Sequence, residues 1–98
     1  MPAHQLRAIG MHYVYALCST KDKNLYVGRT DDLRRRLAEH NNGETFATAP
    51  RRPFKLVYYE AYMVEEDAEK RERSLKLRGQ ARNHLMGRLV ASLRQARS

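Results

Sequence analysis

Three side chains able to do chemistry fall beside the apolar faces of predicted helices. Helical positions advance by about 100° per residue, which places Arg36 and His40 beside the apolar face of a helix over residues 31–42, and Glu72 beside that of a helix over residues 65–77. An ionised group at the edge of a core is costly unless it is paired or bound to a metal. Two interpretations of Arg36 and Glu72 stay open: a salt bridge or boundary side chains that reach water, and a reactive pair. A histidine such as His40 is by itself more often a hydrogen-bonded boundary residue than a catalyst.

Two tyrosines lie on a predicted hairpin formed by residues 12–18 and 25–29. Side chains alternate along a strand, so Tyr15 and Tyr26 project side by side from one face if Tyr15 lies opposite Gly28. A register one residue away puts the phenols on opposite faces. The sequence leaves both registers open, and strand tyrosines usually do no more than cover a sheet.

The remaining elements are predicted from turn residues and hydrophobic periodicity. They are a loop over residues 43–53, a third strand over 54–62, the helix over 65–77 and a last helix over 80–94. The order ββαβαα predicts an α/β (α+β) fold in which helices flank a small, mostly antiparallel three-stranded sheet. Residues 1–11 are expected to form a flexible N-terminal arm, and residues 12–95 a single domain.

Composition narrows the class of protein. The 98 residues include 19 Lys and Arg against 11 Asp and Glu, a formal charge of +8. A single cysteine, Cys18, excludes a disulfide scaffold and a zinc finger and fits a reducing cytoplasm. The longest apolar run, residues 56–59, is far too short to span a bilayer, so no membrane partner is expected. Residues 73–98 carry no acid, which suits nucleic-acid binding and a solvated helix face about equally well.

Taken in order, these residues resemble the GIY-YIG nucleases. Tyr13-Val14-Tyr15 and Tyr26-Val27-Gly28 are similar to the two tripeptides of the family name, with Tyr13 in place of the first glycine. Within residues 32–41, Arg36 corresponds to the catalytic arginine of the family, and within residues 68–76, Glu72 corresponds to its metal-binding glutamate. The resemblance covers residues 12–90 and is closest to the small bacterial stand-alone members. Asn83 is the nearest counterpart of a late asparagine found in many members.

The resemblance implies the GIY-YIG nuclease fold and an endonuclease that hydrolyses phosphodiester bonds in DNA with Mg²⁺ or Mn²⁺. Tyr15 is the first choice for the general base or water-orienting group, and the metal and Arg36 are expected to lower its pKa. The implied catalytic residues are Tyr15, Tyr26, Arg36, His40 and Glu72, of which Glu72 holds the metal. The residues expected to bind the nucleic-acid backbone are Arg29, Arg51, Arg52, Lys76 and Arg82.

A chain this short has no room for a targeting domain. The expected enzyme is therefore structure-selective or weakly sequence-specific, acting on single-stranded or branched DNA in repair or processing, with RNA as a further substrate to test. The alternative is a non-catalytic nucleic-acid-binding module with the same fold.

Overall fold

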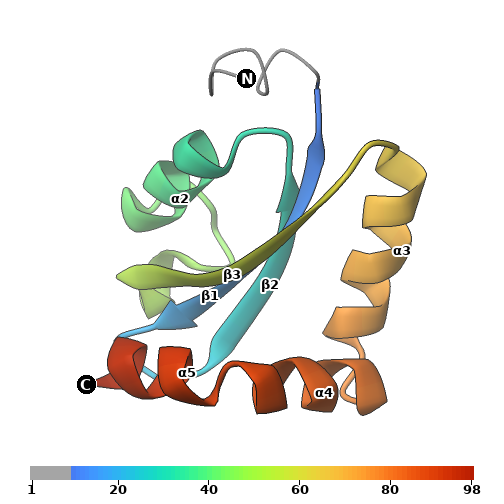
Figure 1. Cartoon of the computed structure of the whole chain (residues 1–98). Helices are drawn as coiled ribbons and strands as arrows, with labels where there is room; N and C mark the ends of the chain where they lie inside the picture. Colours follow the sequence, from blue (N-terminus) through green and yellow to red (C-terminus); the bar gives the residue numbers. More distant parts are fainter. Residues whose placement is uncertain (1–9) are drawn as a thin grey trace, which may run out of the picture.

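A computed structural model describes residues 10–98. The predicted arm, residues 1–11, falls almost wholly outside the described residues, and the predicted domain boundaries stay predictions. The described chain forms a three-stranded antiparallel sheet with helices on both sides (Figure 1). The expected α+β class is therefore confirmed. Between residues 10 and 98, no helix is both long and apolar enough to cross a membrane.

The first two strands form the predicted hairpin. Strand β1 spans His12–Ser19 and strand β2 spans Leu25–Thr30. The Ser19 hydroxyl accepts hydrogen bonds from the backbone N–H groups of Lys21 and Asp22, at 3.1 and 3.0 Å. A serine that caps the turn in this way satisfies backbone donors that the strands cannot pair.

The hairpin register settles how the two tyrosines lie. Tyr15 pairs with Gly28, and Leu17 pairs with Tyr26. This is the register that puts Tyr15 and Tyr26 on one face of the sheet. The turn holds this register, because the Ser19 N–H donates to the Asn24 carbonyl at 3.0 Å and so fixes how the two strands pair.

Strand β3 completes the sheet. It spans Phe54–Tyr62 and pairs with β1, which gives the order β2-β1-β3. Its first residue is tied to the helix that precedes it: the Asn41 side chain donates to the Phe54 carbonyl at 3.2 Å and accepts from the Phe54 N–H at 2.7 Å. These two bonds fix where the intervening loop begins and ends.

Helix α2 covers the face that carries the tyrosines. It spans Leu33–Asn41, and the Asp32 carboxylate caps it by accepting from the backbone N–H of Arg35 at 3.1 Å. Its apolar side packs on a small cluster made by Tyr15, Leu17 and Phe54, with Tyr26, Leu33 and Leu37 against it. The helix is therefore seated directly over the sheet face from which Tyr15 projects.

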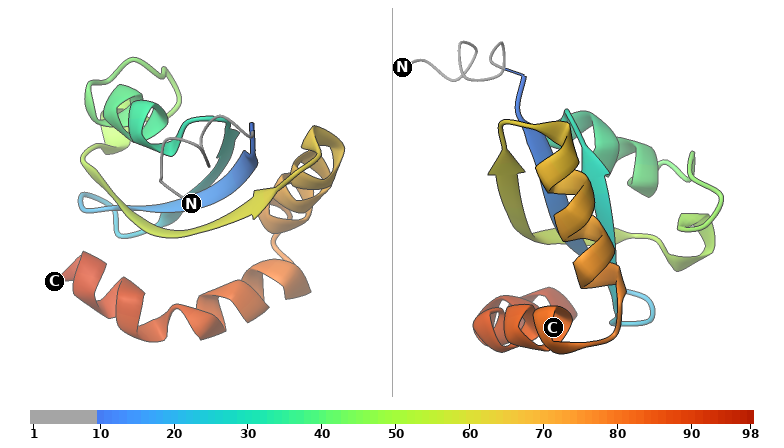
Figure 2. Two further views of the ribbon diagram at one scale, coloured as in Figure 1. Left: turned by 45° about the horizontal axis from the view of Figure 1, so that its top comes forward. Right: turned by 90° about the vertical axis from the view of Figure 1, so that its right-hand side faces the viewer.

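The larger core lies on the opposite face. Helices α3 (Glu65–Lys76), α4 (Gln80–Arg88) and α5 (Val90–Arg97) surround it. Figure 2 shows α2 on one side of the sheet and α4 with α5 on the other. The buried residues of this core are Val14, Cys18, Leu25, Val27, Ala68, Leu75, Leu85, Leu89, Leu93 and Ala96.

The last predicted helix is divided in two. The chain leaves helical geometry at Leu89, whose N–H bonds the Met86 carbonyl at 3.1 Å in a tighter turn. Gly87, just before the break, is a weak helix former. Leu85, Leu89 and Leu93 are all buried in the core on both sides of the break.

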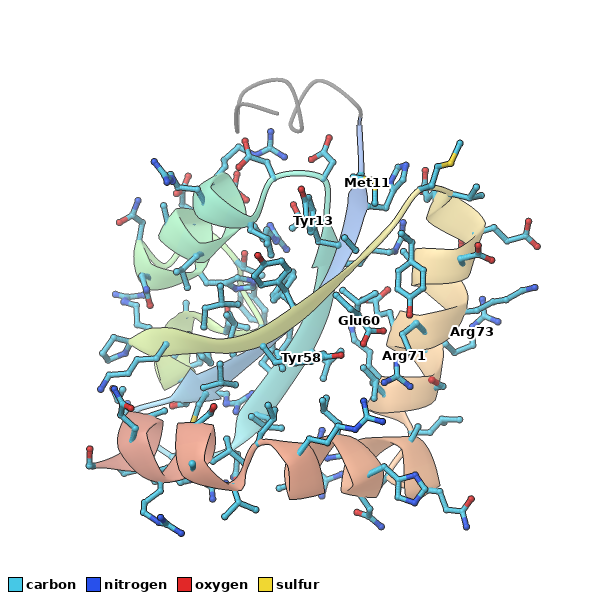
Figure 3. The ribbon with its side chains drawn as sticks, viewed as in Figure 1. Met11, Tyr13, Tyr58, Glu60, Arg71 and Arg73 are labelled. Carbon is cyan, nitrogen blue, oxygen red and sulfur yellow. The ribbon has the colours of Figure 1, made fainter. Side chains whose placement is uncertain are left out.

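A polar cluster joins β3 to α3 (Figure 3). Glu60 accepts hydrogen bonds from the Tyr58 and Tyr62 hydroxyls and pairs with Arg71 of α3 at 2.6 Å. Burial raises the pKa of Glu60, but these three donors outweigh it and hold that pKa below its usual range. Burial, together with the bond to Glu60, raises the pKa of Tyr62 to about 12. The cluster anchors α3 at the residue next to Glu72.

Candidate active site

Tyr15 packs against Gly28 of the neighbouring strand. Tyr15 is 3% exposed, and a Cβ built on Gly28 would overlap its hydroxyl and Cζ atoms. The backbone at Gly28 is ordinary extended strand, so glycine is required here for space and not for its conformation. The absence of a side chain at Gly28 leaves the space that the end of the Tyr15 ring occupies.

A chain of hydrogen bonds begins at the Tyr15 hydroxyl. Tyr15 Oη lies 2.8 Å from His40 Nε2, and His40 Nδ1 lies 2.8 Å from Thr48 Oγ1. The Thr48 hydroxyl in turn reaches the Thr45 carbonyl at 3.4 Å. Both His40 and Thr48 are fully buried. The predicted boundary histidine is therefore an interior group with a partner on each ring nitrogen.

Arg36 lies one helical turn before His40, at the opening of this chain. Its Nε donates to Tyr15 Oη at 3.4 Å and its Nη1 donates to Glu39 at 3.0 Å. The side chain is 32% exposed. Because the guanidinium is held on one edge and open to solvent on another, it can contact an anion without losing its bond to Tyr15.

Tyr26 connects the histidine to α3. Its ring meets the His40 ring edge-on, with centroids 5.2 Å apart, and Lys76 Nζ lies 5.5 Å from its ring centre. The Tyr26 and His40 rings pack in the edge-to-face geometry that aromatic pairs favour.

Glu72 stands at the α3 side of the site with both carboxylate oxygens occupied. Arg29 Nε lies 3.3 Å from Oε1 and Lys76 Nζ lies 3.2 Å from Oε2. Arg29 also pairs with Glu65 at 2.9 Å, and its bonds to both carboxylates raise its pKa. The interhelical bridge that the sequence left open does not join Arg36 to Glu72, because Arg36 pairs with Glu39 instead. Two cations predicted to bind nucleic acid, Arg29 and Lys76, are the partners of Glu72.

Burial decides the protonation of the central pair. It raises the pKa of Tyr15, and the hydrogen bond and charge of Arg36 offset this only in part. Arg36 alone therefore does not bring the pKa of this phenol below its usual value, and the expected lowering by a metal and Arg36 together stays a prediction. Burial and the charge of Arg36 both lower the pKa of His40, with Glu39 opposing them. At neutral pH the site holds a neutral phenol against a neutral imidazole.

The carboxylates present suit only a weakly coordinated metal. Among residues 10–98 no three His, Cys, Asp or Glu side chains gather as a cage for an ion. Glu72 is 20% exposed, and its charge is felt by Tyr15. Mg²⁺ commonly keeps several waters and takes one or two carboxylates plus substrate oxygens. Glu72 fits that mode of binding, provided that Arg29 or Lys76 yields one oxygen.

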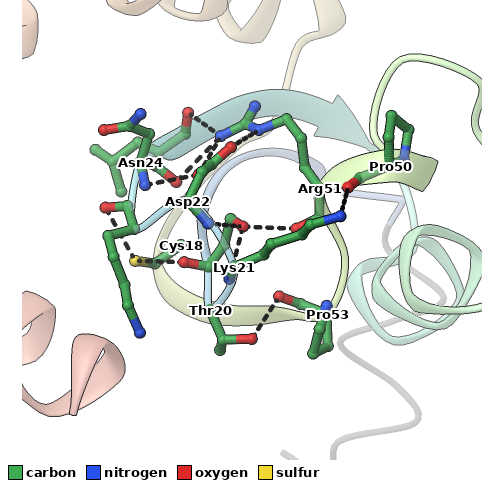
Figure 4. Close-up of polar contacts among 11 residues, drawn as sticks. Cys18, Thr20, Lys21, Asp22, Asn24, Pro50, Arg51 and Pro53 are labelled. Carbon is green, nitrogen blue, oxygen red and sulfur yellow. Dashed lines mark hydrogen bonds and ion pairs between the residues drawn. The ribbon is translucent and has the colours of Figure 1, made fainter.

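Arg51, which is also predicted to bind nucleic acid, braces the hairpin turn (Figure 4). Its Nε pairs with Asp22 at 2.6 Å, its Nη2 reaches the carbonyls of Asn24 and Leu25, and its guanidinium lies over the Phe54 ring. The bond from Arg51 lowers the pKa of Asp22 to about 2. These contacts account for Arg51 as a structural residue.

The other predicted phosphate-binding residues differ in how exposed they are and in which partners they already have. Arg52 is exposed and donates to the Ala49 carbonyl at 3.3 Å. Arg82, on α4, is half-buried, and burial followed by the charges of Arg78 and Arg51 lowers its pKa. Asn83 is exposed on the same helix. Arg52 and Arg82 therefore keep N–H groups that can bind an anion, whereas most N–H groups of Arg51 already donate within the protein.

A surface pocket of about 280 Å³ adjoins the site. It is lined by His12, Arg29, Thr30, Asp31 and Glu65. Another, of about 230 Å³, lies between β3 and α5, away from Tyr15 and His40. The first pocket shares Arg29 with the Glu72 cluster.

Thr48 was not among the residues that the sequence singled out. It lies in the loop that precedes a short 3-10 helix, η1, at Ala49–Arg51. No spacing rule connects a loop threonine to a helical histidine eight residues earlier. Only the fold of the loop brings it to His40.

The site thus contains two phenols against a buried imidazole, with a guanidinium and a carboxylate at its rim. A site of this class suits an anionic phosphate group. Comparison with known proteins agrees. Residues 11–85 match the model of the GIY-YIG catalytic domain, so the chain belongs to the GIY-YIG family. The family consists in general of divalent-metal-dependent endonucleases that act on nucleic acid. The resemblance seen in the sequence is thus confirmed.

Several bacterial and archaeal proteins are similar to this chain. A UPF0213 protein of Lactiplantibacillus plantarum is 39% identical over 83 residues, 82% of this chain and 81% of that protein. One of Staphylococcus saprophyticus is 41% identical over 66 residues, covering 66% and 79%. Another, of Haloquadratum walsbyi, is 43% identical over 67 residues, covering 66% and 73%. The solution structure of the UPF0213 protein BH0048 from Bacillus halodurans is similar over 81% of this chain and 84% of that chain, with 34% identity and a TM-score of 0.50.

Proposed function

We propose that this protein is a Mg²⁺- or Mn²⁺-dependent endonuclease that hydrolyses phosphodiester bonds in DNA. The observation that carries the proposal is the hydrogen-bonded set of Arg36, Tyr15 and His40, with Glu72 across Tyr26. Arg36 presents a guanidinium that can hold the scissile phosphate, and such donors are worth most where negative charge develops. Glu72 would hold the metal, which would stabilise that same charge.

The neutral pair of Tyr15 and His40 supplies a route for the proton of the attacking water. As the water O–H bond breaks, its proton passes to Tyr15 Oη, and the original Tyr15 proton passes to His40 Nε2 over 2.8 Å. The resulting hydroxide forms the new bond to phosphorus as the bond from phosphorus to the leaving oxygen breaks, and the leaving oxygen takes a proton from solvent. His40 is therefore the final base, and Tyr15 relays the proton without ever carrying a full negative charge. This replaces the idea of Tyr15 as an independently ionised base.

An exposed aromatic side chain supports a substrate with unpaired bases. Phe46 is 97% exposed and stands two residues before Thr48, in the loop that contacts His40. Arg52, near the end of the same loop, is exposed as well. An aromatic platform beside a cation favours single-stranded or branched nucleic acid, because bases can stack on it. We therefore assign the enzyme to the processing or repair of such DNA, with RNA as a substrate to be tested. The cytoplasmic location expected from the single cysteine stays a prediction.

The rival function is a non-catalytic nucleic-acid-binding module. The observation that favours it is the pairing of both Glu72 oxygens with Arg29 and Lys76, which a catalytic metal must disturb. Labelled single-stranded, duplex and branched DNA and RNA, each incubated with Mg²⁺, Mn²⁺ or chelator, separate the two. Products that chelator suppresses support the nuclease, and binding without products supports the module.

Two substitutions test the assigned roles. Arg36→Ala and Glu72→Ala should each abolish metal-dependent nicking while the circular dichroism spectrum and melting temperature stay near those of the parent. The matched controls are Arg34→Ala and Glu69→Ala, which remove the same charges from exposed positions of the same helices. Undiminished cutting by either site variant would contradict the mechanism.

A further inference from the structure

Thr48 is the buried end of the hydrogen-bond chain that runs through His40. It is fully buried, and its loop is held by local backbone bonds: the N–H groups of Thr48 and Ala49 both reach the Thr45 carbonyl, at 3.1 and 2.9 Å. The Thr48 hydroxyl thus has a fixed position, 2.8 Å from His40 Nδ1.

Counting donors and acceptors along this chain of hydrogen bonds shows in which direction each proton is donated. A hydroxyl carries one proton, and a neutral imidazole carries one N–H and one lone pair. If the Thr48 hydroxyl donates to the Thr45 carbonyl, His40 Nδ1–H donates to Thr48 and Nε2 accepts from the Tyr15 hydroxyl. Arg36 Nε–H then donates to the Tyr15 oxygen. Each of these protons has an acceptor.

The opposite direction leaves a buried donor without a partner. If Thr48 donated to His40 Nδ1, His40 Nε2–H would donate to Tyr15 Oη. The Tyr15 proton would then need another acceptor, and its remaining hydrogen-bond partner among residues 10–98 is the guanidinium of Arg36, which can only donate. Tyr15 is 3% exposed, and a buried O–H group without an acceptor is strongly disfavoured.

We propose that Thr48 is a positioning residue that holds His40 as the Nδ1–H tautomer and so keeps Nε2 free to accept the Tyr15 proton. The inference deepens the proposed nuclease function and rests on it. When the proton moves, the Tyr15 O–H bond breaks, an N–H bond forms at Nε2, and the imidazolium keeps Thr48 as the acceptor for its Nδ1–H. Thr48 touches neither substrate nor metal and acts through His40.

Nitrogen-15 NMR of imidazole-labelled protein tests the tautomer without any substrate. The parent protein should show His40 with a protonated Nδ1 and an unprotonated Nε2 at neutral pH. Thr48→Val keeps the shape and removes the hydroxyl, so the Nε2–H form should gain population and kcat should fall about 10- to 100-fold, as for losses of other orienting groups. Thr48→Ser, which keeps the hydroxyl, should restore both the tautomer and most of the rate.

Thr45→Val is the matched control. Thr45 takes part in the hydrogen-bond chain only through its backbone carbonyl, which the substitution keeps, so the His40 tautomer should stay as in the parent. A parent protein with His40 protonated at Nε2 would overturn the proposal, and so would a Thr48→Val protein with unchanged tautomer and rate. Should Thr48→Val fail to fold, the parent spectrum and Thr48→Ser still decide. If the parent cleaves none of the tested nucleic acids, the proposed function fails while the tautomer measurement stands on its own.

Discussion

Replacing Gly28 with alanine should push Tyr15 out of its place. The added Cβ would overlap the hydroxyl and Cζ atoms of Tyr15 and lie 3.0 Å from its Cε1 atom. Rotation at Tyr15 cannot relieve this cheaply, since the ring is 3% exposed and packed against α2. The backbone of β2 accepts alanine readily, so the effect comes from space alone.

The size of the effect follows from the distances. Ordinary van der Waals contact begins near 3.4 Å, and the Tyr15 hydroxyl oxygen would lie 2.3 Å from the added Cβ. The end of the ring must therefore move by about 1 Å, and a close-packed core has few voids to receive it. That stretches the bond between Tyr15 and His40, now 2.8 Å, beyond hydrogen-bond range. Forcing extra atoms into a packed core costs about 1–3 kcal/mol, and misplacing a reacting group by about 1 Å can lower the rate about 100-fold.

The assay pairs thermal unfolding with cleavage. Gly28→Ala should lower Tm by roughly 4–8 °C for each kcal/mol lost and reduce metal-dependent nicking about 100-fold. Gly87→Ala is the matched control, because nothing lies within 4 Å of a Cβ at that helical position. It should leave cleavage unchanged and stabilise the fold by up to about 1 kcal/mol. Full activity and an unchanged Tm in Gly28→Ala would refute the close approach on which this reasoning depends.

Three further predictions concern other parts of the molecule. Glu60→Gln should lower the free energy of unfolding at pH 7 by about 1–3 kcal/mol. The lowered pKa of Glu60 means that its contribution is present above the unfolded pKa, about 4.3, and is lost as pH falls through the folded value. Urea unfolding at pH 7 and at pH 3 should therefore differ less in Glu60→Gln than in the parent protein; an equal difference would contradict the cause given for the shift. Phe46→Ala should weaken binding of single-stranded DNA by about 1–3 kcal/mol and of duplex far less, as fluorescence anisotropy would show; equal losses on both would rule out stacking. Arg51→Ala should lower Tm, whereas Arg52→Ala should leave Tm unchanged and reduce the salt dependence of DNA binding by about one phosphate contact; a reversed pattern would exchange their roles.

Local patterns in the sequence were enough to predict the helices and strands and the types of residue at the site. The hairpin, the helix that carries Arg36 and His40 one turn apart, and the order of the elements along the chain all follow from periodicity and turn residues that act over a few positions. The same locality explains the error at the end of the chain. Periodic leucines continue across Leu89, and only the backbone of the folded chain, in which the Leu89 N–H bonds the Met86 carbonyl, shows that the helix is interrupted there.

Contacts between distant segments needed the tertiary structure. The sequence offered two registers for the hairpin, and only the folded hairpin shows that Tyr15 pairs with Gly28. The sequence also did not show that Asp22 and two carbonyls hold Arg51 in the turn. Such assignments depend on which partners a folded chain brings within a few ångströms, and charge or spacing along the sequence does not encode that distance.

The sequence by itself determined that tyrosines, an arginine, a histidine and a glutamate are present in the order typical of a GIY-YIG domain. Tertiary structure alone decided that His40 is buried between Tyr15 and Thr48, and that Glu72 is paired with cations from β2 and α3. The physical reason is that a proton path and a charge balance depend on distances, burial and hydrogen-bond direction. Those quantities arise only when the loop, the sheet and the helices pack together.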